Sequence, residues 1–301
     1  MGHIITDLKQ TFKRGNIVTQ LIFINTGVFV LTSLLSVFFK LFNRNADSVL
    51  QLFELPASLS RLLYQPWSLI TYMFMHAGIL HILFNMLWLY WFGTISLYFF
   101  TNKHLRGIYL FGGLCGGLLY LLSYNIFPYF AETVDQSLMV GASASILAIV
   151  TATAYREPNY PVRLLLIGTV RLKYLALIVV LADLMFLTSD NAGGHISHLG
   201  GALAGFWFAS CLSRGVDVTA WINKIPDGIA SLFDRKTWRR KPKMKVHYGR
   251  GRTMREMDYD YNARKKAQSD EIDRILDKLK RSGYESLTTE EKKRLFDASK
   301  R

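Results

Sequence analysis

Long apolar runs alternate with short polar connections over the first two-thirds of the chain. Six of these runs come close to the ~20 residues that an α-helix needs to cross ~30 Å of hydrocarbon. They lie at about 17–39, 79–100, 106–124, 138–155, 173–188 and 195–213. The first is too long for the core of a signal peptide, so we expect it to remain as an anchor. The pattern predicts an all-α, polytopic membrane protein with six transmembrane helices.

The chain is mostly polar after residue 213, and the first apolar positions at helical spacing there lie between Trp221 and Phe233. Seven basic residues follow between Arg235 and Lys245. An amphipathic segment next to a polybasic one is typical of a chain that lies on anionic lipid. Nucleic-acid binding is the weaker explanation for the same charge. We expect a cytoplasmic N-terminal segment at 1–15, a membrane domain at 16–213, and a basic juxtamembrane segment and linker at 214–268.

The last 33 residues, 269–301, predict a small helical hairpin. An apolar stripe from Ile272 to Leu279 ends before Gly283, and Thr288 with Glu291 three residues later forms a capping-box pattern. Leu295 and the following phenylalanine are expected to close on the first stripe.

Composition supports this division, because half of the 301 residues are hydrophobic while the net charge is +14. The connections between spans two and three and between spans four and five carry Lys and Arg. The connections at 125–137 and 189–194 carry none. Positive charge favours the cytoplasmic side of a membrane. We therefore expect both termini in the cytoplasm.

Candidate chemistry lies near the outer ends of spans four and six. Ser143 and His198 fall at similar depth on the same side of the membrane, and an ionisable group at that depth is usually functional. A serine and a histidine can act as a nucleophile and its base. His81 and Asn85 share one face of span two. With backbone N–H groups of the first turn near Ala142, they can hold an oxyanion.

Each of these assignments has an alternative. Ser143 alone is typical of helix packing, and His81 with Asn85 can bond each other or a loop backbone. His195 lies one turn before His198 and is a rival base. Asp183, inside span five, has no partner that the sequence identifies, and a hydrogen bond to a neighbouring helix is the favoured reading.

Small residues favour a close approach between spans four and six. Gly201 and Gly205 form a small-xxx-small face, and Gly141 precedes the serine in the same packing region. Metal chemistry is not expected, because the chain has no His-Glu-x-x-His motif, and Cys115 and Cys211 lie in separate spans. We expect neither a metal nor a cofactor.

Together these motifs resemble the rhomboid intramembrane serine proteases in their bacterial six-helix form. The resemblance covers about 16–213. It rests on Pro66-Trp67, His76, His81-x-x-x-Asn85, Gly141-x-Ser143-Ala144 and His198-x-x-Gly201-x-x-x-Gly205. The tail resembles a small uncharacterised domain appended to some members.

The resemblance implies a Ser143–His198 dyad that cleaves single-span membrane proteins in or near their transmembrane helix. It also implies a location in the bacterial cytoplasmic membrane. The chain differs at Leu147, where the family commonly has an aromatic ring stacked on the histidine, and at Ala144, often Gly. A catalytically silent rhomboid-like protein that binds membrane helices is the alternative, although such proteins lack the serine or the histidine. A channel or transporter is a weaker one.

Overall fold

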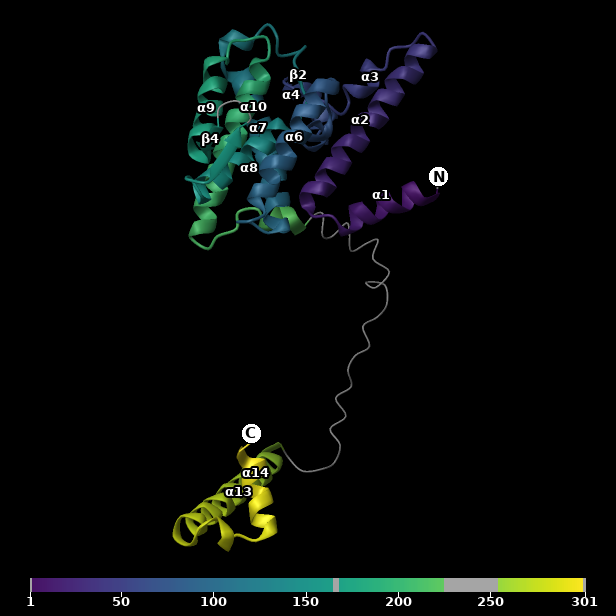
Figure 1. The fold of residues 1–301 in the computed structure, drawn as a ribbon. Helices are drawn as coiled ribbons and strands as arrows, with labels where there is room; N and C mark the ends of the chain where they lie inside the picture. The colour runs from purple at the N-terminus through teal and green to yellow at the C-terminus, as the bar shows by residue number, and fades with distance from the viewer. Residues whose placement is uncertain (1, 165–167, 225–253, 300–301) are drawn as a thin grey trace. The chain divides into compact units, whose positions relative to one another are not determined.

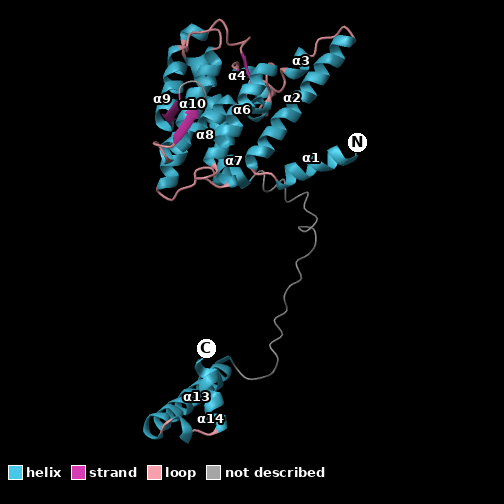
Figure 2. Cartoon of the chain, viewed as in Figure 1, coloured by secondary structure: helices cyan, strands magenta, loops and turns pink. Residues whose placement is uncertain are grey.

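A computed structural model describes residues 2–164, 168–224 and 254–299 (Figure 1). The chain divides into two compact units, 1–238 and 239–301. Helices dominate both units, and the first unit also contains two short strand pairs (Figure 2).

The six predicted membrane helices are all present in the first unit (Figure 1). They are α2 (Ile17–Leu41), α6 (Ile79–Ser96), α7 (Asn102–Ile126), α8 (Ser143–Arg156), α9 (Leu172–Met185) and α10 (Ala192–Ser213). The remaining elements are α1 (Gly2–Arg14), α3 (Asp47–Leu50), β1 (Leu55–Pro56), α4 (Leu59–Tyr64), α5 (Ser68–Thr71), η1 (Tyr72–Phe74), η2 (Pro128–Phe130), β2 (Leu138–Met139), β3 (Pro161–Leu164) and β4 (Gly168–Arg171).

In the described part of the chain, four helices are long and apolar enough to cross a membrane by themselves: α2, α6, α7 and α10. The other two, α8 and α9, have 14 residues each. At 1.5 Å per residue they are about 21 Å long, short of the ~30 Å of hydrocarbon. The short length of α8 matters because the helix begins at the candidate nucleophile.

The prediction that span four begins near residue 138 was wrong. Residues 138 and 139 form β2, which pairs antiparallel with β1, so that Leu55 lies opposite Met139. The amide of Gly141 donates to the carbonyl of Tyr72 at 2.9 Å, and Gly141 itself has a φ of +132°. This backbone conformation favours glycine. An apolar stretch can form a strand as well as a helix, and here pairing with residues 55–56 makes residues 138–139 a strand.

Three helices pack on one another through small residues: α7, α8 and α10. A Cβ added at Gly201 would lie 2.1 Å from the carbonyl oxygen of Ala144, and one at Gly205 would lie 2.1 Å from that of Ala148. A step of four residues along α10 thus corresponds to a step of four residues in the same direction along α8, so the two helices run parallel. The predicted close approach of spans four and six is therefore present. It places the start of α8 beside the second turn of α10.

The chain folds back after α10. Asn223, in a short helical stretch at 220–224, donates to the carbonyl of Lys103 at 3.1 Å and accepts from Arg106 at 2.8 Å. Ile222 is buried against Phe111 of α7 and Ala204 of α10. The first residues of the predicted juxtamembrane segment thus pack on protein. Its basic run from 235 to 245 lies outside the described residues.

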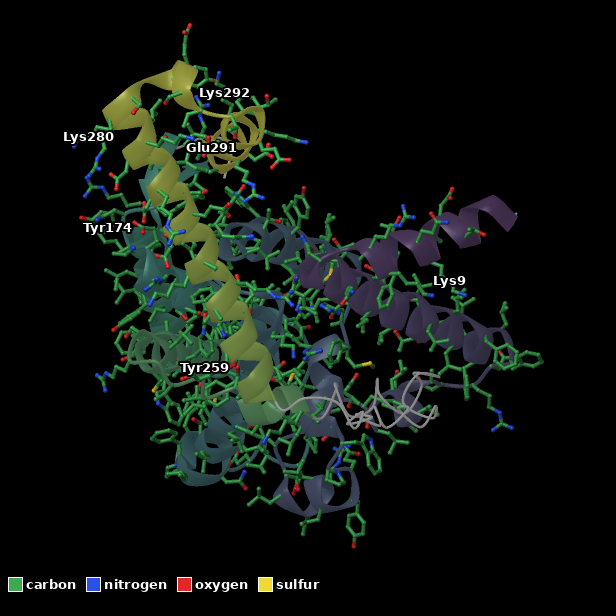
Figure 3. The ribbon with its side chains drawn as sticks, turned by 90° about the horizontal axis from the view of Figure 1, so that it is seen from below. Lys9, Tyr174, Tyr259, Lys280, Glu291 and Lys292 are labelled. Carbon is green, nitrogen blue, oxygen red and sulfur yellow. The ribbon has the colours of Figure 1, made fainter. Side chains whose placement is uncertain are left out.

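The second unit is a helical hairpin of α13 (Met254–Ser282), η3 (Tyr284–Ser286) and α14 (Thr289–Ser299). The capping box is confirmed, since Thr288 N–H donates to Glu291 at 2.7 Å and Glu291 N–H donates to the threonine hydroxyl at 3.3 Å. Glu291 also pairs with Lys278 across the hairpin at 2.9 Å (Figure 3 labels Glu291).

Two expectations for the hairpin differ from the structure. The first helix begins at Met254, before the predicted boundary at 269. The sequence pattern did not indicate its early turns because they are polar and lack an apolar stripe. Phe296 stays 59% exposed, whereas Ile275 and Leu287 are buried. The buried contact between the two helices is therefore smaller than the sequence pattern indicates.

Candidate active site

Ser143 and His198 lie within hydrogen-bonding distance. Ser143 is the first residue of α8, and His198 lies in the second turn of α10. The Oγ of Ser143 and the Nε2 of His198 are 2.7 Å apart. A hydroxyl that donates to an unprotonated imidazole nitrogen is the arrangement that a serine nucleophile and its base require.

Asp183 of α9 lies on the other side of the His198 ring. Its Oδ1 is 2.9 Å from Nδ1 of His198 and 2.8 Å from Nδ1 of His195. The favoured expectation, a hydrogen bond to a neighbouring helix, agrees with this contact, but the sequence did not identify which helix or residue. His195 bonds to Asp183, while His198 occupies the bonding position at Ser143.

His81 of α6 lies next to the start of α8. Its Nδ1 accepts from the amide of Ala77 at 3.3 Å, which leaves Nε2 as the protonated nitrogen of a neutral ring. A Cβ added at Gly141 would be 3.0 Å from His81 Nε2 and 3.6 Å from Ser143 Oγ. Nε2 of His81 and the serine hydroxyl therefore border the same space beside Gly141, and both residues line one cavity. This geometry suits a donor to an oxyanion.

Asn85 lies one turn further along α6 and is buried. Its amide nitrogen donates to the carbonyl of His81 at 2.9 Å and has a second N–H. Ala142 is the N-cap residue of α8, so the amides around Ser143 belong to the first turn, which has no partners within the helix. The helix dipole favours negative charge at this end.

His76 lies in the turn before α6 with its ring 5.2 Å from that of His81. It is buried, and neither ring nitrogen has a hydrogen-bond partner among the described residues. Burial is the main cause that lowers the pKa of His76 to about 4, and the nearby His81 ring contributes to this lowering. His76 is therefore neutral at neutral pH and supports the position of His81 by ring contact.

A cavity of about 1070 Å³ opens over Ser143 and His198. Residues of α6, α8, α9 and α10 and of the segment before α8 line it, with His81, Asn85 and Asp183 among them. Apolar side chains of α6 and α9 form two of its walls, for example Phe84, Trp88 and Ile178. The cavity combines an apolar lining with a few convergent polar groups, which is typical of a substrate site.

Leu147, one turn after Ser143, packs in a cluster with Phe92 of α6 and with Ala176 of α9. The His198 ring packs edge to face on the ring of His195, with ring centroids 6.1 Å apart. Support for the His198 ring therefore comes from Asp183, which the sequence did not link to it. The only available signal was an acid at membrane depth.

Asp183, His195 and His198 also form the one cluster with metal-ligating geometry among the residues that the structure describes. Their ligand atoms lie within 4.8 Å of one another. The Nδ1 atoms of both histidines are already hydrogen-bonded to Asp183 Oδ1. Cys115 and Cys211 are both free thiols.

Comparison with known proteins gives matches for both units. A family model described as "Rhomboid domain" matches residues 64–215, half of the chain. Residues 255–301 match a family of unknown function, DUF6576. A curated protein of Arabidopsis thaliana named "RHOMBOID-like protein 12, mitochondrial" is 28% identical over 196 residues, which are 62% of this chain and 55% of that protein. The chain thus spans about half the length of this relative.

Proposed function

The chain belongs to the rhomboid family, and we propose that it is a serine endopeptidase that cleaves single-span membrane proteins in or near their transmembrane helix. One observation supports the proposal above others. The Ser143 hydroxyl is 2.7 Å from Nε2 of His198, and both residues line a cavity of about 1070 Å³. The chain is an integral membrane protein, so a cavity with polar groups at this depth gives water access to a peptide bond that lipid would otherwise shield.

The first half of the reaction forms an acyl-enzyme. As Ser143 Oγ bonds to the scissile carbonyl carbon, its proton passes to Nε2 of His198. Negative charge develops on the carbonyl oxygen, where His81 Nε2–H, the Asn85 amide and first-turn N–H groups near Ala142 can donate. The C–N bond then breaks, and His198 gives its proton to the leaving amine.

The second half releases the new carboxyl terminus. A water molecule gives a proton to His198 Nε2 as its oxygen bonds to the acyl carbon. The bond to Ser143 Oγ breaks, and His198 returns the proton to the serine. Atoms balance over the cycle, because one water is consumed and one peptide bond is hydrolysed.

The walls of the cavity suggest how a substrate helix enters. Apolar residues of α6 and α9 face the space above Ser143, and several of them, including Phe84 and Ile178, are exposed. A transmembrane segment that approaches between these helices would place its backbone near the serine.

We assign the termini to the cytoplasm of a bacterium from the distribution of basic residues and the six-helix pattern. The basic run at 235–245 would bind anionic lipid.

Cleavage of a model single-span substrate tests the proposal. The wild-type protein in detergent should release two fragments, while Ser143→Ala and His198→Ala should each lose at least ~10³-fold in rate. Substrate binding without cleavage by the wild type would instead favour the catalytically silent alternative. Equal cleavage by all three proteins would rule out the protease.

A further inference from the structure

Asp183 is an intramembrane carboxyl group that the dyad chemistry does not use. Its side chain is 6% exposed, and its Oδ2 has no hydrogen-bond partner among the described residues. A buried charge is costly unless it is paired, and in a membrane helix it usually has a function. Its contacts are the two histidines of α10, both through Oδ1.

Because both histidines bond to the same oxygen of Asp183, an ionised Asp183 determines which nitrogen of each ring is protonated. Oδ1 is within 2.9 Å of Nδ1 of His198 and 2.8 Å of Nδ1 of His195. One oxygen cannot donate to both rings, but a carboxylate oxygen can accept from both. When Asp183 is ionised, as the triad requires, each ring therefore carries its proton on Nδ1. For His198 this leaves Nε2 unprotonated, and Nε2 is the atom 2.7 Å from the Ser143 hydroxyl.

We propose that Asp183 is a positioning residue that completes a Ser143–His198–Asp183 triad within the membrane domain. This inference rests on the proposed function. Asp183 selects the tautomer in which His198 can accept the serine proton, and its charge stabilises the imidazolium that forms. Asp183 keeps its own charge throughout the cycle. Three separate helices supply the array, so the position of α9 is coupled to the readiness of the base.

His195 holds the carboxylate from its second side. It donates to the same oxygen and packs on Phe186 at the end of α9, with ring centroids 5.7 Å apart. Its contacts attach the start of α10 to α9 without reaching Ser143. His195→Phe keeps the ring packing and removes one of the two donors to Asp183, so it should lower kcat less than Asp183→Asn does. The same variant would be inactive if His195 were the base.

Substitution of Asp183 tests the triad. Asp183→Asn keeps the shape and removes the charge, and it should lower kcat by about 10²–10⁴-fold with KM little changed. Asp135→Asn is the matched control, because it removes an exposed carboxylate in the loop before β2 and should leave kcat unchanged. Wild-type kcat in Asp183→Asn would overturn the inference.

A tautomer measurement separates positioning from mere structural support. Nitrogen NMR of ¹⁵N-histidine-labelled Ser143→Ala protein, with the His198 signals identified by their loss in a Ser143→Ala/His198→Gln double variant, should show protonated Nδ1 and unprotonated Nε2. Adding Asp183→Asn should shift the ring towards protonated Nε2. A His198 that is protonated on Nε2 with Asp183 intact would overturn the inference, even if the aspartate variants fail to fold.

Different results would exclude the protease activity and the triad. If Ser143→Ala still cleaves substrate, the proposed function is wrong. If Ser143→Ala is inactive and Asp183→Asn is fully active, the protease assignment survives and only the triad is lost.

Discussion

Substitution of Gly201 by alanine tests whether close packing of α8 and α10 sets the geometry of the site. The added Cβ would lie 2.1 Å from the carbonyl oxygen of Ala144, where ordinary contacts begin at 3.4 Å. The two helices must therefore separate by about 1 Å at this point. Overpacking of this kind costs about 1–3 kcal/mol, of which the better helix propensity of alanine returns up to about 1 kcal/mol.

The effect on activity should exceed the effect on stability. Ala144 adjoins Ser143, and Gly201 lies one turn after His198, so the separation falls between nucleophile and base. Their bond of 2.7 Å would lengthen beyond normal hydrogen-bond range. A misplacement of 1 Å can cost ~10²-fold in rate. We expect kcat to fall by about that factor, and Gly201→Val to be inactive.

The assay is cleavage of the single-span substrate in detergent, together with thermal unfolding of each variant. Gly27→Ala in α2 is the matched control, because a Cβ there meets nothing within 4 Å. It should keep full activity and unfold at the same temperature or slightly higher. If Gly201→Ala has the stability and turnover of the wild type, close packing does not set the geometry of the site.

Three further predictions concern separate parts of the chain. Asn85→Ala should lower kcat by about 10²–10³-fold if the amide binds the oxyanion, and an unchanged kcat would remove it from that role. Tyr109→Phe deletes a buried hydroxyl that donates to the Met73 carbonyl at 3.0 Å, and it should cost about 1–3 kcal/mol by thermal unfolding while activity per folded molecule is kept. The pKa of Glu291 is lowered, mainly because Thr288 N–H donates to it, so its contribution to the hairpin is complete above its ordinary pKa of 4.5 and is lost as pH falls through the lowered value. Hydrogen exchange in the full chain should therefore show that Glu291→Ala loosens the first turn of α14 at pH 7 but not in strong acid; equal effects at both would contradict this.

The helices and the serine–histidine pair could be predicted because they depend on local pattern. Hydropathy over ~20 residues locates membrane helices, and helix period places His81 and Asn85 on one face. The glycines one turn apart on span six indicate a close neighbour. Each of these signals lies within one helix or between two motifs with known spacing.

The contacts of Asp183 could not be predicted, because they depend on how α9 is rotated and how far it lies along α10. A 14-residue helix with one acid does not contain that information. The start of α8 is similar, since Leu138 and Met139 are apolar enough for a helix and become strand only by pairing with β1. In both cases the deciding partner lies on another element, which the period of a single helix or strand cannot place.

Covalent labelling most directly tests whether Ser143 is a nucleophile that His198 activates. The wild-type protein is treated with a fluorophosphonate, digested, and the modified residue located by mass spectrometry. We expect a phosphonate adduct on Ser143, which disappears in His198→Ala because the base is missing. Labelling of another serine, or labelling of Ser143 that is as fast without His198, would contradict it.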